Sequence, residues 1–318
     1  MPSSNSIPAE VQSVMVEVEG RRFWRESFAV SGTITLVVMP RLLAFGAFAG
    51  LVCLLDNSIH HIDFGMEVGP HEVAGGVLGL LLVLRTNAGQ DRWWEARKLW
   101  GEVTNTCRIL AVDAVAYGPD DPDWRERFLR LLAAFPHVLR ASLRGQHALP
   151  EVATLLGAEE AARIAAAEHM PTRVDLELAL LLRVAVDRHG MDRLAFLAIN
   201  RRRARFLDLV GGCERILKTP MPRISAIIIR RFIVVYVATL PFALMAKIGD
   251  LLTPVVTMLV AYPILSLDQA GVDLQNPFST RSLSHLPLEQ FCRTIEGNVL
   301  ATLADRPASA ASATVDVT

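Results

Sequence analysis

The sequence lacks the features that mark several common classes of protein. Its formal net charge is only -1, from 32 Lys and Arg against 33 Asp and Glu, so no overall imbalance points to nucleic acid as a partner. The four cysteines stand singly, without a CxxC pair, which argues against a disulfide framework or a cysteine metal cluster. We expect reduced, structural thiols.

Motifs of common enzymes are also missing. The chain has no G-x-S-x-G, no glycine-rich phosphate loop and no H-E-x-x-H, so an enzyme would need an unfamiliar set of residues. Near the beginning we find no apolar core with a small-residue cleavage site, and we expect no removable signal peptide. Strand-like alternation is nearly absent. The near absence of strand patterns predicts an all-helical chain, and the missing motifs favour a protein that is not an enzyme. A membrane enzyme stays open as an alternative, and it would need a buried group with a strongly shifted pKa in a cavity.

Apolar residues are what the chain has in excess. Hydrophobic residues make up 52% of the sequence and the mean hydropathy is +0.34, which favours a membrane protein. Residues 33–55 are long enough to cross a hydrocarbon layer about 30 Å thick, although Pro40 and Arg41 interrupt them. Residues 232–246 and 251–267 are predicted to form two further spans, joined by a tight turn.

Within these apolar regions, one charged residue and two glycine pairs need an interpretation. Arg41 requires a partner, water or a path to the membrane surface for its charge. Gly46 and Gly50 form one GxxxG, and Gly75 and Gly79 form another. Small residues at this spacing let membrane helices approach closely, so we predict a packing role.

A shorter apolar run, residues 73–84, is followed directly by the polar residues Arg85, Asn87 and Gln90. A helix of this length rises only about 18 Å, well short of the membrane core. Such a helix is stable if neighbouring helices shield it or if it borders water. We therefore predict that residues 73–84 line a pore or a cavity.

The distribution of charge predicts the topology. Residues 85–231 hold 24 Lys and Arg against 18 acidic residues, whereas residues 56–72 hold no Lys or Arg, so the first segment is predicted inside and the second outside. Four crossings follow, with both termini cytoplasmic. The predicted parts are a cytoplasmic N-terminal segment (1–32), two transmembrane helices with the lining helix and an interfacial helix (33–100), a helical cytoplasmic domain (101–223), two more transmembrane helices (224–268), and a cytoplasmic C-terminal segment with a flexible tail (269–318).

Helical spacing predicts that the cytoplasmic domain is folded. One helix begins after "GPDDPD", whose Asp and Pro residues suit a helix start, and carries Phe128 and Phe135 at helical spacing. A second helix begins near residue 191 and carries Leu194, Leu197 and Ala198, with basic residues on its other faces.

The helix after residue 84 contains a tryptophan-rich motif. Its residues are Arg92, Trp93, Trp94 and Trp100. Trp93, Arg97 and Trp100 share one helical face, while Glu95 can pair with Lys98. Because tryptophan favours the boundary between lipid and water, we predict an interfacial anchor that packs on neighbouring helices. A cation-π or ligand contact at Trp93 or Trp94 is the alternative.

Three histidines, His60, His61 and His71, gather around the predicted outside loop. Without a fixed scaffold they are a weak metal-binding pattern, so we interpret them as exposed loop residues and predict no metal site.

Several segments together resemble bacterial bestrophin homologues, in the same order along residues 23–303. They are "LRTNAGQDRWWEARKLWG", the PR of "VVMPRLL", "GGCERILKTPMP", "LPFAL", "LLTPVVTMLVAYPILSLD" and "LQNPFSTRSLSHLPLEQFCRTIEGNVL". The resemblance implies a homopentameric ion channel of the bacterial inner membrane, in which the second membrane helix of each subunit lines a neck and the cytoplasmic domains enclose a wider vestibule.

The resemblance also implies where ions pass. Its neck residues carry over to Gly76, Leu80 and Leu84, and a cytoplasmic aperture carries over to Leu197. Leucine rings around a narrow path can gate by excluding water. Gly76 stands where the family often has a bulky apolar residue. Calcium needs several oxygen ligands, and Arg281 stands where the eukaryotic members have carboxylates, so we predict no calcium site.

The resemblance leaves the conducted ion open between chloride and sodium. An apolar neck does not decide the sign of charge, and the basic cytoplasmic segment favours anions only weakly. No cofactor is implied, and the expected surroundings are the lipid bilayer and identical subunits. From a different class, the alternative is a membrane-anchored helical scaffold or signalling protein, which would carry no ion flux and would expose an apolar patch on its cytoplasmic helices.

Overall fold

The computed structural model describes residues 34–58 and 66–304, which form helices and no strand. This confirms the predicted all-helical class. The chain divides into two compact units. Unit 1 comprises Met1–Thr86 and Arg223–Gly271, and unit 2 comprises Asn87–Pro222 and Val272–Thr318.

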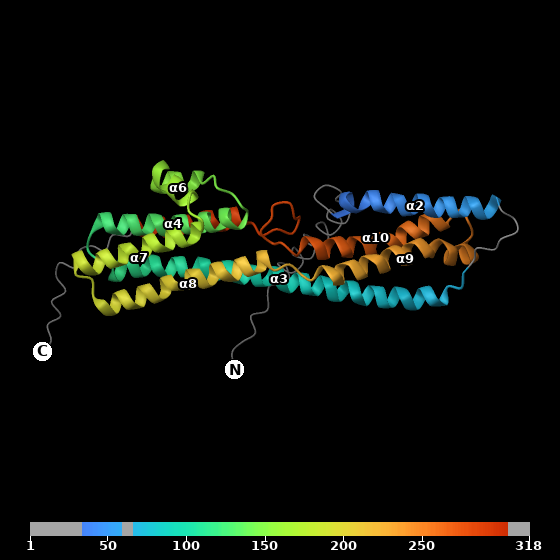
Figure 1. The fold of residues 1–318 in the computed structure, drawn as a ribbon, viewed down its shortest axis with the longest axis horizontal. Helices are drawn as coiled ribbons and strands as arrows, with labels where there is room; N and C mark the ends of the chain where they lie inside the picture. The colour runs from blue at the N-terminus through green and yellow to red at the C-terminus, as the bar shows by residue number, and fades with distance from the viewer. Residues whose placement is uncertain (1–33, 59–65, 305–318) are drawn as a thin grey trace, which may run out of the picture. The chain divides into compact units, whose positions relative to one another are not determined.

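The described residues of unit 1 form four helical segments, whose helices can be followed in Figure 1. They are α2 (Ile34–Ser58), the first part of α3 (Gly69–Tyr117), α9 (Arg223–Ile248) and nearly all of α10 (Thr253–Asp273). Each segment contributes buried residues to one core, for example Val38, Leu78, Val237 and Ala261. Their other faces expose many large apolar side chains, such as Leu54 and Leu259. Exposed apolar faces of this kind suit a hydrocarbon surrounding.

Within residues 34–58 and 66–304, three helical stretches are long and apolar enough to cross a membrane. They are Ile34–Ser58, Arg193–Met245, which runs from α8 through most of α9, and Thr253–Asp273. Residues 73–84 lie within α3, which is not among these three, so the fourth crossing stays a prediction.

Close helix packing occurs at one glycine of each GxxxG pair. A Cβ added at Gly46 would lie 2.5 Å from the sulfur of Met258, and one added at Gly75 would lie 2.8 Å from the hydroxyl of Tyr236. These glycines therefore let α2 approach α10 and let α3 approach α9. A Cβ added at Gly50 or at Gly79 would have no neighbouring atom within 4 Å.

Unit 2 is a helical bundle around α4 (Pro122–Leu143). The other helices are the second part of α3, α5 (Pro150–Leu156), α6 (Ala158–Ala165), α7 (Met170–His189), α8 (Arg193–Lys218) and α11 (Leu288–Ala304). Helix α4 packs against α5, α7, α8 and α11. Asp121 caps its first turn by accepting hydrogen bonds from two backbone amides, and Phe128 and Phe135 are fully buried. The predicted helix start and its apolar face are both confirmed.

The second predicted helix of this unit is α8, but its core-facing residues differ from those singled out in the sequence. Leu194, Leu197 and Ala198 are exposed, whereas Ile199 and Phe206 pack into the core of unit 2. The exposed surface of α8 therefore includes these three apolar residues as well as basic residues.

The boundary between the units falls after Thr86, within α3, and the predicted domain limits stay a prediction. Residues of α3 such as Trp100 and Val103 are fully buried in the core of unit 2, so the tryptophan-rich part of α3 belongs to that unit. The C-terminal segment also belongs there, because α11 packs against α4. Residues 272–304 thus pack within unit 2.

Candidate functional site

The predicted neck residues share one exposed face of α3. Leu80 and Leu84 are 60% and 56% exposed, and a Cβ added at Gly76 would meet open space. Leu78 and Leu82, between them in sequence, point into the core of unit 1. Since residues four apart lie one above the other on a helix, α3 presents an apolar stripe that the rest of the described chain leaves uncovered.

The tryptophan-rich motif holds a loop of unit 2 in place. Arg92 donates hydrogen bonds of 2.8 Å to the backbone carbonyls of Gln275 and Thr219. The Trp93 indole nitrogen donates one of 2.7 Å to the carbonyl of Ser284. Arg92 and Trp93 of the RWW motif therefore contact Gln275 and Ser284, which stand on either side of NPF in the chain.

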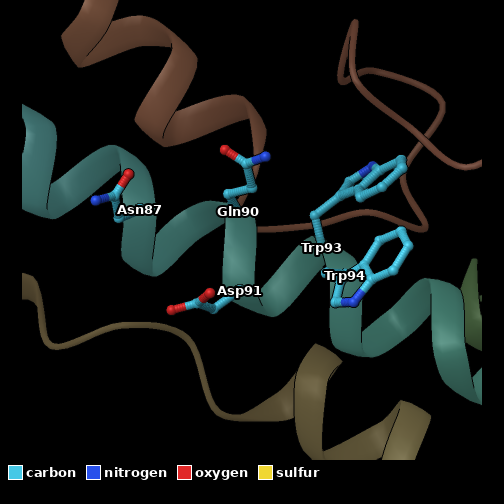
Figure 2. A pocket seen from close by; sticks show the side chains of 5 residues that line it. All are labelled: Asn87, Gln90, Asp91, Trp93 and Trp94. Atoms are coloured by element: carbon cyan, nitrogen blue, oxygen red, sulfur yellow. The ribbon is translucent and has the colours of Figure 1, made fainter.

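A pocket lies beside this motif on α3 (Figure 2). It is lined by Asn87, Gln90, Asp91, Trp93 and Trp94. The rings of Trp93 and Trp94 are nearly parallel, with centroids 6.4 Å apart, and Trp94 is 55% exposed. The pocket thus combines amide, carboxylate and indole groups, so it offers a partner both hydrogen bonds and an aromatic surface. An interfacial role of Trp93 and Trp94 stays a prediction.

Trp100 differs from its expected role. It is fully buried in the core of unit 2 and lies 6.5 Å, between ring centroids, from Phe291. A fully buried ring has no surface at a lipid boundary, so Trp100 serves packing and not anchoring. The cation-π contact of this region joins Arg97 to Phe291, 4.8 Å from the ring centroid, rather than involving Trp93 or Trp94.

Three arginines of α8 pair with three acidic residues of α3. The pairs are Arg202 with Asp113, Arg205 with Glu102 (3.1 Å), and Arg215 with Glu95. The hydrogen bond from Arg202 to the Asp113 carboxylate raises the pKa of the arginine. Glu95 thus pairs with Arg215, not with Lys98 as expected from the helix alone. Each pair joins opposite charges within residues 85–231, so the net positive excess of that segment is unchanged.

Leu197, the residue expected at a cytoplasmic aperture, is 62% exposed on α8. Its exposure leaves it available to contact other copies of the chain, and its role stays a prediction.

The histidine interpretation is wrong for His71. This residue is buried in α3, and its Nε2 lies 2.9 Å from the Thr239 hydroxyl. His60 and His61 lie outside the described residues. Among the described residues no group of three or more His, Cys, Asp and Glu side chains could hold a metal ion. Arg281 is exposed, with its backbone amide bonded to the Ser279 hydroxyl at 3.3 Å.

One ionic cluster in unit 1 is not predicted from the sequence. Asp268 of α10 is buried and pairs with both Arg85 and Arg230. The sequence does contain a signal for this cluster, because Asp268 directly follows the apolar run 251–267. A charged side chain in a membrane helix costs free energy to bury and usually has a function.

Comparisons with known proteins agree with these features. The profile of the Bacterial/Fungal Bestrophin protein family matches residues 15–301. The Voltage-dependent anion channel-forming protein YneE of Escherichia coli is 31% identical over 284 residues, covering 89% of this chain and 92% of that protein. A protein of the same description from Ralstonia nicotianae, RSc3414, is 30% identical and covers 81% and 85%. The crystal structure of a bacterial bestrophin homologue from Klebsiella pneumoniae has a TM-score of 0.76 at 26% identity, covering 84% and 98%.

Proposed function

This chain belongs to the bacterial/fungal bestrophin family, and on that premise we propose that it is an anion channel rather than an enzyme. It conducts chloride or other monovalent anions passively across the bacterial inner membrane, as a homopentamer with both termini cytoplasmic. Its relatives are named as anion channel-forming proteins, which supports an anion channel, and the long apolar helices support its place in a membrane.

The exposed stripe on α3 is the observation that carries the proposed pathway. A helix buries its apolar residues when they face its own chain, as Leu78 and Leu82 do. Leu80 and Leu84 are apolar yet uncovered, so they are available to face equivalent residues of other subunits around a central path. Rings of leucine there form a hydrophobic gate, which stops ions by excluding water.

Reversal potentials test the ion and the channel together. Purified protein in a planar bilayer under a tenfold NaCl gradient should reverse near the chloride equilibrium potential, about 59 mV from zero for a single charge. A reversal near the sodium potential would keep the channel and overturn the anion selectivity. No current, even from gate variants of a verified oligomer, would favour the alternative of a membrane-anchored scaffold.

Gate variants test the path. Leu80→Ala with Leu84→Ala should raise the unit conductance or the open probability, because a wider, less apolar ring admits water more readily. Gly76→Leu should lower the conductance by adding an apolar ring. The matched control is Leu54→Ala, an exposed leucine of α2, which should leave the currents unchanged. Leu197→Ala should raise conductance if this residue narrows the cytoplasmic exit.

A further inference from the structure

A groove in unit 1 runs between α2 and α9 and consists of two overlapping pockets. The first is lined by Arg41, Phe45, Arg230, Ile233, Val234, Leu265 and Asp268. The second is lined by Arg41, Ala44, Phe45, Phe48 and Ala238. Arg41 and Phe45 belong to both pockets, so the two form one continuous depression, which we call the α2–α9 groove.

One end of the α2–α9 groove carries an excess of positive charge. Asp268 accepts hydrogen bonds from Arg85 and from the Nε of Arg230, the latter at 3.3 Å. Arg41 donates to the side-chain oxygen of Gln269 at 3.4 Å. Three arginines therefore gather near one carboxylate, which leaves a formal excess of two positive charges.

The carboxylate leaves much of the arginines' hydrogen-bonding capacity unused. Arg85 is buried and does not line the groove, although its Nη2 has no hydrogen-bond partner among the described residues. The donors that the groove itself offers belong to Arg41 and Arg230. Arg230 pairs with Asp268 through Nε, and its side chain is still 51% exposed. A guanidinium offers five donors in a planar fork. An excess of such donors beside membrane helices requires an anionic partner or water.

The chemistry of the donors selects the kind of anion. Arginine forks match phosphate oxygens in geometry and charge. Arg41 and Arg230 lie in the early turns of α2 and α9, and Asp268 lies in the last turns of α10. Arg85, which pairs with Asp268, is the residue at which α3 passes from the apolar run 73–84 into the basic segment 85–231. This end of the helices is therefore on the predicted cytoplasmic side. Basic pockets between membrane helices on that side suit anionic lipid headgroups.

The other end of the groove distinguishes a lipid from a free anion. Beyond Arg41 the groove is lined by Phe45, Phe48 and the small residue Ala238. These side chains form an apolar surface without an ionic group. A free phosphate would make no use of this surface, whereas an acyl chain would cover it. We propose that the α2–α9 groove binds an anionic phospholipid, with its phosphate at Arg41 and Arg230 and one acyl chain along Phe45, Phe48 and Ala238.

Native mass spectrometry of the purified full-length protein tests this site. Phosphatidylglycerol, titrated into the detergent-solubilised protein, should bind at about tenfold lower concentration than phosphatidylcholine of the same chain length. Arg41→Gln combined with Arg230→Gln should abolish this preference. Arg231→Gln, which removes a neighbouring exposed arginine outside the groove lining, should retain it. Equal binding of the two lipids, or an equal loss in the Arg231→Gln control, would overturn the proposal.

A second variant keeps the charges and blocks the acyl chain. Ala238→Trp should weaken phosphatidylglycerol binding while all three arginines remain, so the proposal stays testable even if the double arginine variant fails to fold. Inorganic phosphate at millimolar concentration should not displace the lipid.

Full displacement of the lipid by phosphate, or unchanged lipid binding in Ala238→Trp, would mean that the groove is a site for a free anion. A changed oligomeric state in the arginine variants without any lipid preference would mean that a second copy of the chain covers the groove. The proposal goes beyond ion conduction, and lipid binding can fail or succeed whatever current the protein carries.

Discussion

The two units place their large apolar side chains in opposite positions. In unit 1, residues such as Leu51, Val235 and Leu259 are exposed, whereas in unit 2 helix α4 buries Phe128, Leu131 and its neighbours. Water drives apolar residues inward in the second case. Lipid supplies no such drive between helices, so close approach at small residues and buried polar contacts must contribute more. Helices of the two units are therefore held together by different forces.

The largest expected effect comes from the buried carboxylate of unit 1. Asp268→Asn should lower the free energy of unfolding by about 3–5 kcal/mol, because it leaves the buried Arg85 without its charged partner. Unfolding in detergent, followed by the loss of helical circular dichroism, measures the change.

The matched control lies on the surface of unit 2. Asp187 pairs with Arg183 at 3.3 Å, and both side chains are mostly exposed. Asp187→Asn should therefore change the free energy of unfolding by less than about 1 kcal/mol. Equal losses in the two variants would contradict the contrast between the units.

Glycine packing in unit 1 gives the next largest effect. Gly46→Leu should destabilise by about 1–3 kcal/mol, because the new side chain meets Met258 at the contact between α2 and α10. Gly50→Leu, one turn further along α2 with open space at its Cβ, is the control and should be nearly neutral. Thermal midpoints in detergent compare the two, and a similar loss at both positions would refute a packing role for Gly46.

The tryptophan contact of unit 2 should be worth less. Trp93→Phe removes the 2.7 Å hydrogen bond to the Ser284 carbonyl and should cost about 1 kcal/mol. Hydrogen exchange should speed up in residues 274–287, since Trp93 no longer holds that loop. Trp94→Phe changes an exposed ring of the same pocket and should leave exchange unaltered. Unchanged exchange in Trp93→Phe would show that Arg92 alone holds the loop.

The smallest effect is a pH dependence in unit 2. The hydrogen bond from Arg144 lowers the pKa of Glu289 from its ordinary 4.5 to about 2. A carboxyl whose pKa is lower in the folded state stabilises the protein above pH 4.5, and this contribution is lost as the pH falls towards 2. The side chain is 46% exposed, so the effect is modest. Glu289→Gln should flatten the dependence of the thermal midpoint on pH in this window; an unaltered slope would assign it to other carboxyls.

Local pattern was enough to predict several parts of the molecule. The Asp and Pro residues before α4 mark its start, because they satisfy the free amides of a first helical turn. The apolar spacing of that helix indicates its buried face. Residues 73–84 were predicted to line a pore or cavity, because an apolar run too short for a span is followed by polar residues; the exposure of Leu80 and Leu84 is compatible with this, and the lining role stays a prediction.

Other features could not be predicted because they join residues far apart in the chain. Glu95 has a helical neighbour of opposite charge in Lys98, yet it pairs with Arg215. Trp100 is of a residue type that favours the membrane interface, but it lies in the core of unit 2. His71 stands near two other histidines in sequence but bonds to Thr239. In each case a distant helix supplies the partner, and spacing along one helix contains no information about it.

By itself, the sequence determined that this protein is helical, that it has apolar spans, and that one face of α3 is apolar, because these depend on composition and on the helical repeat. Only the tertiary structure decided that Arg85 and Arg230 share Asp268, that Arg41 and Phe45 lie in one groove with Arg230, and that the tryptophan-rich part of α3 belongs to unit 2. The physical reason is that charge pairing and burial depend on which helices meet, and packing of the whole chain selects those neighbours.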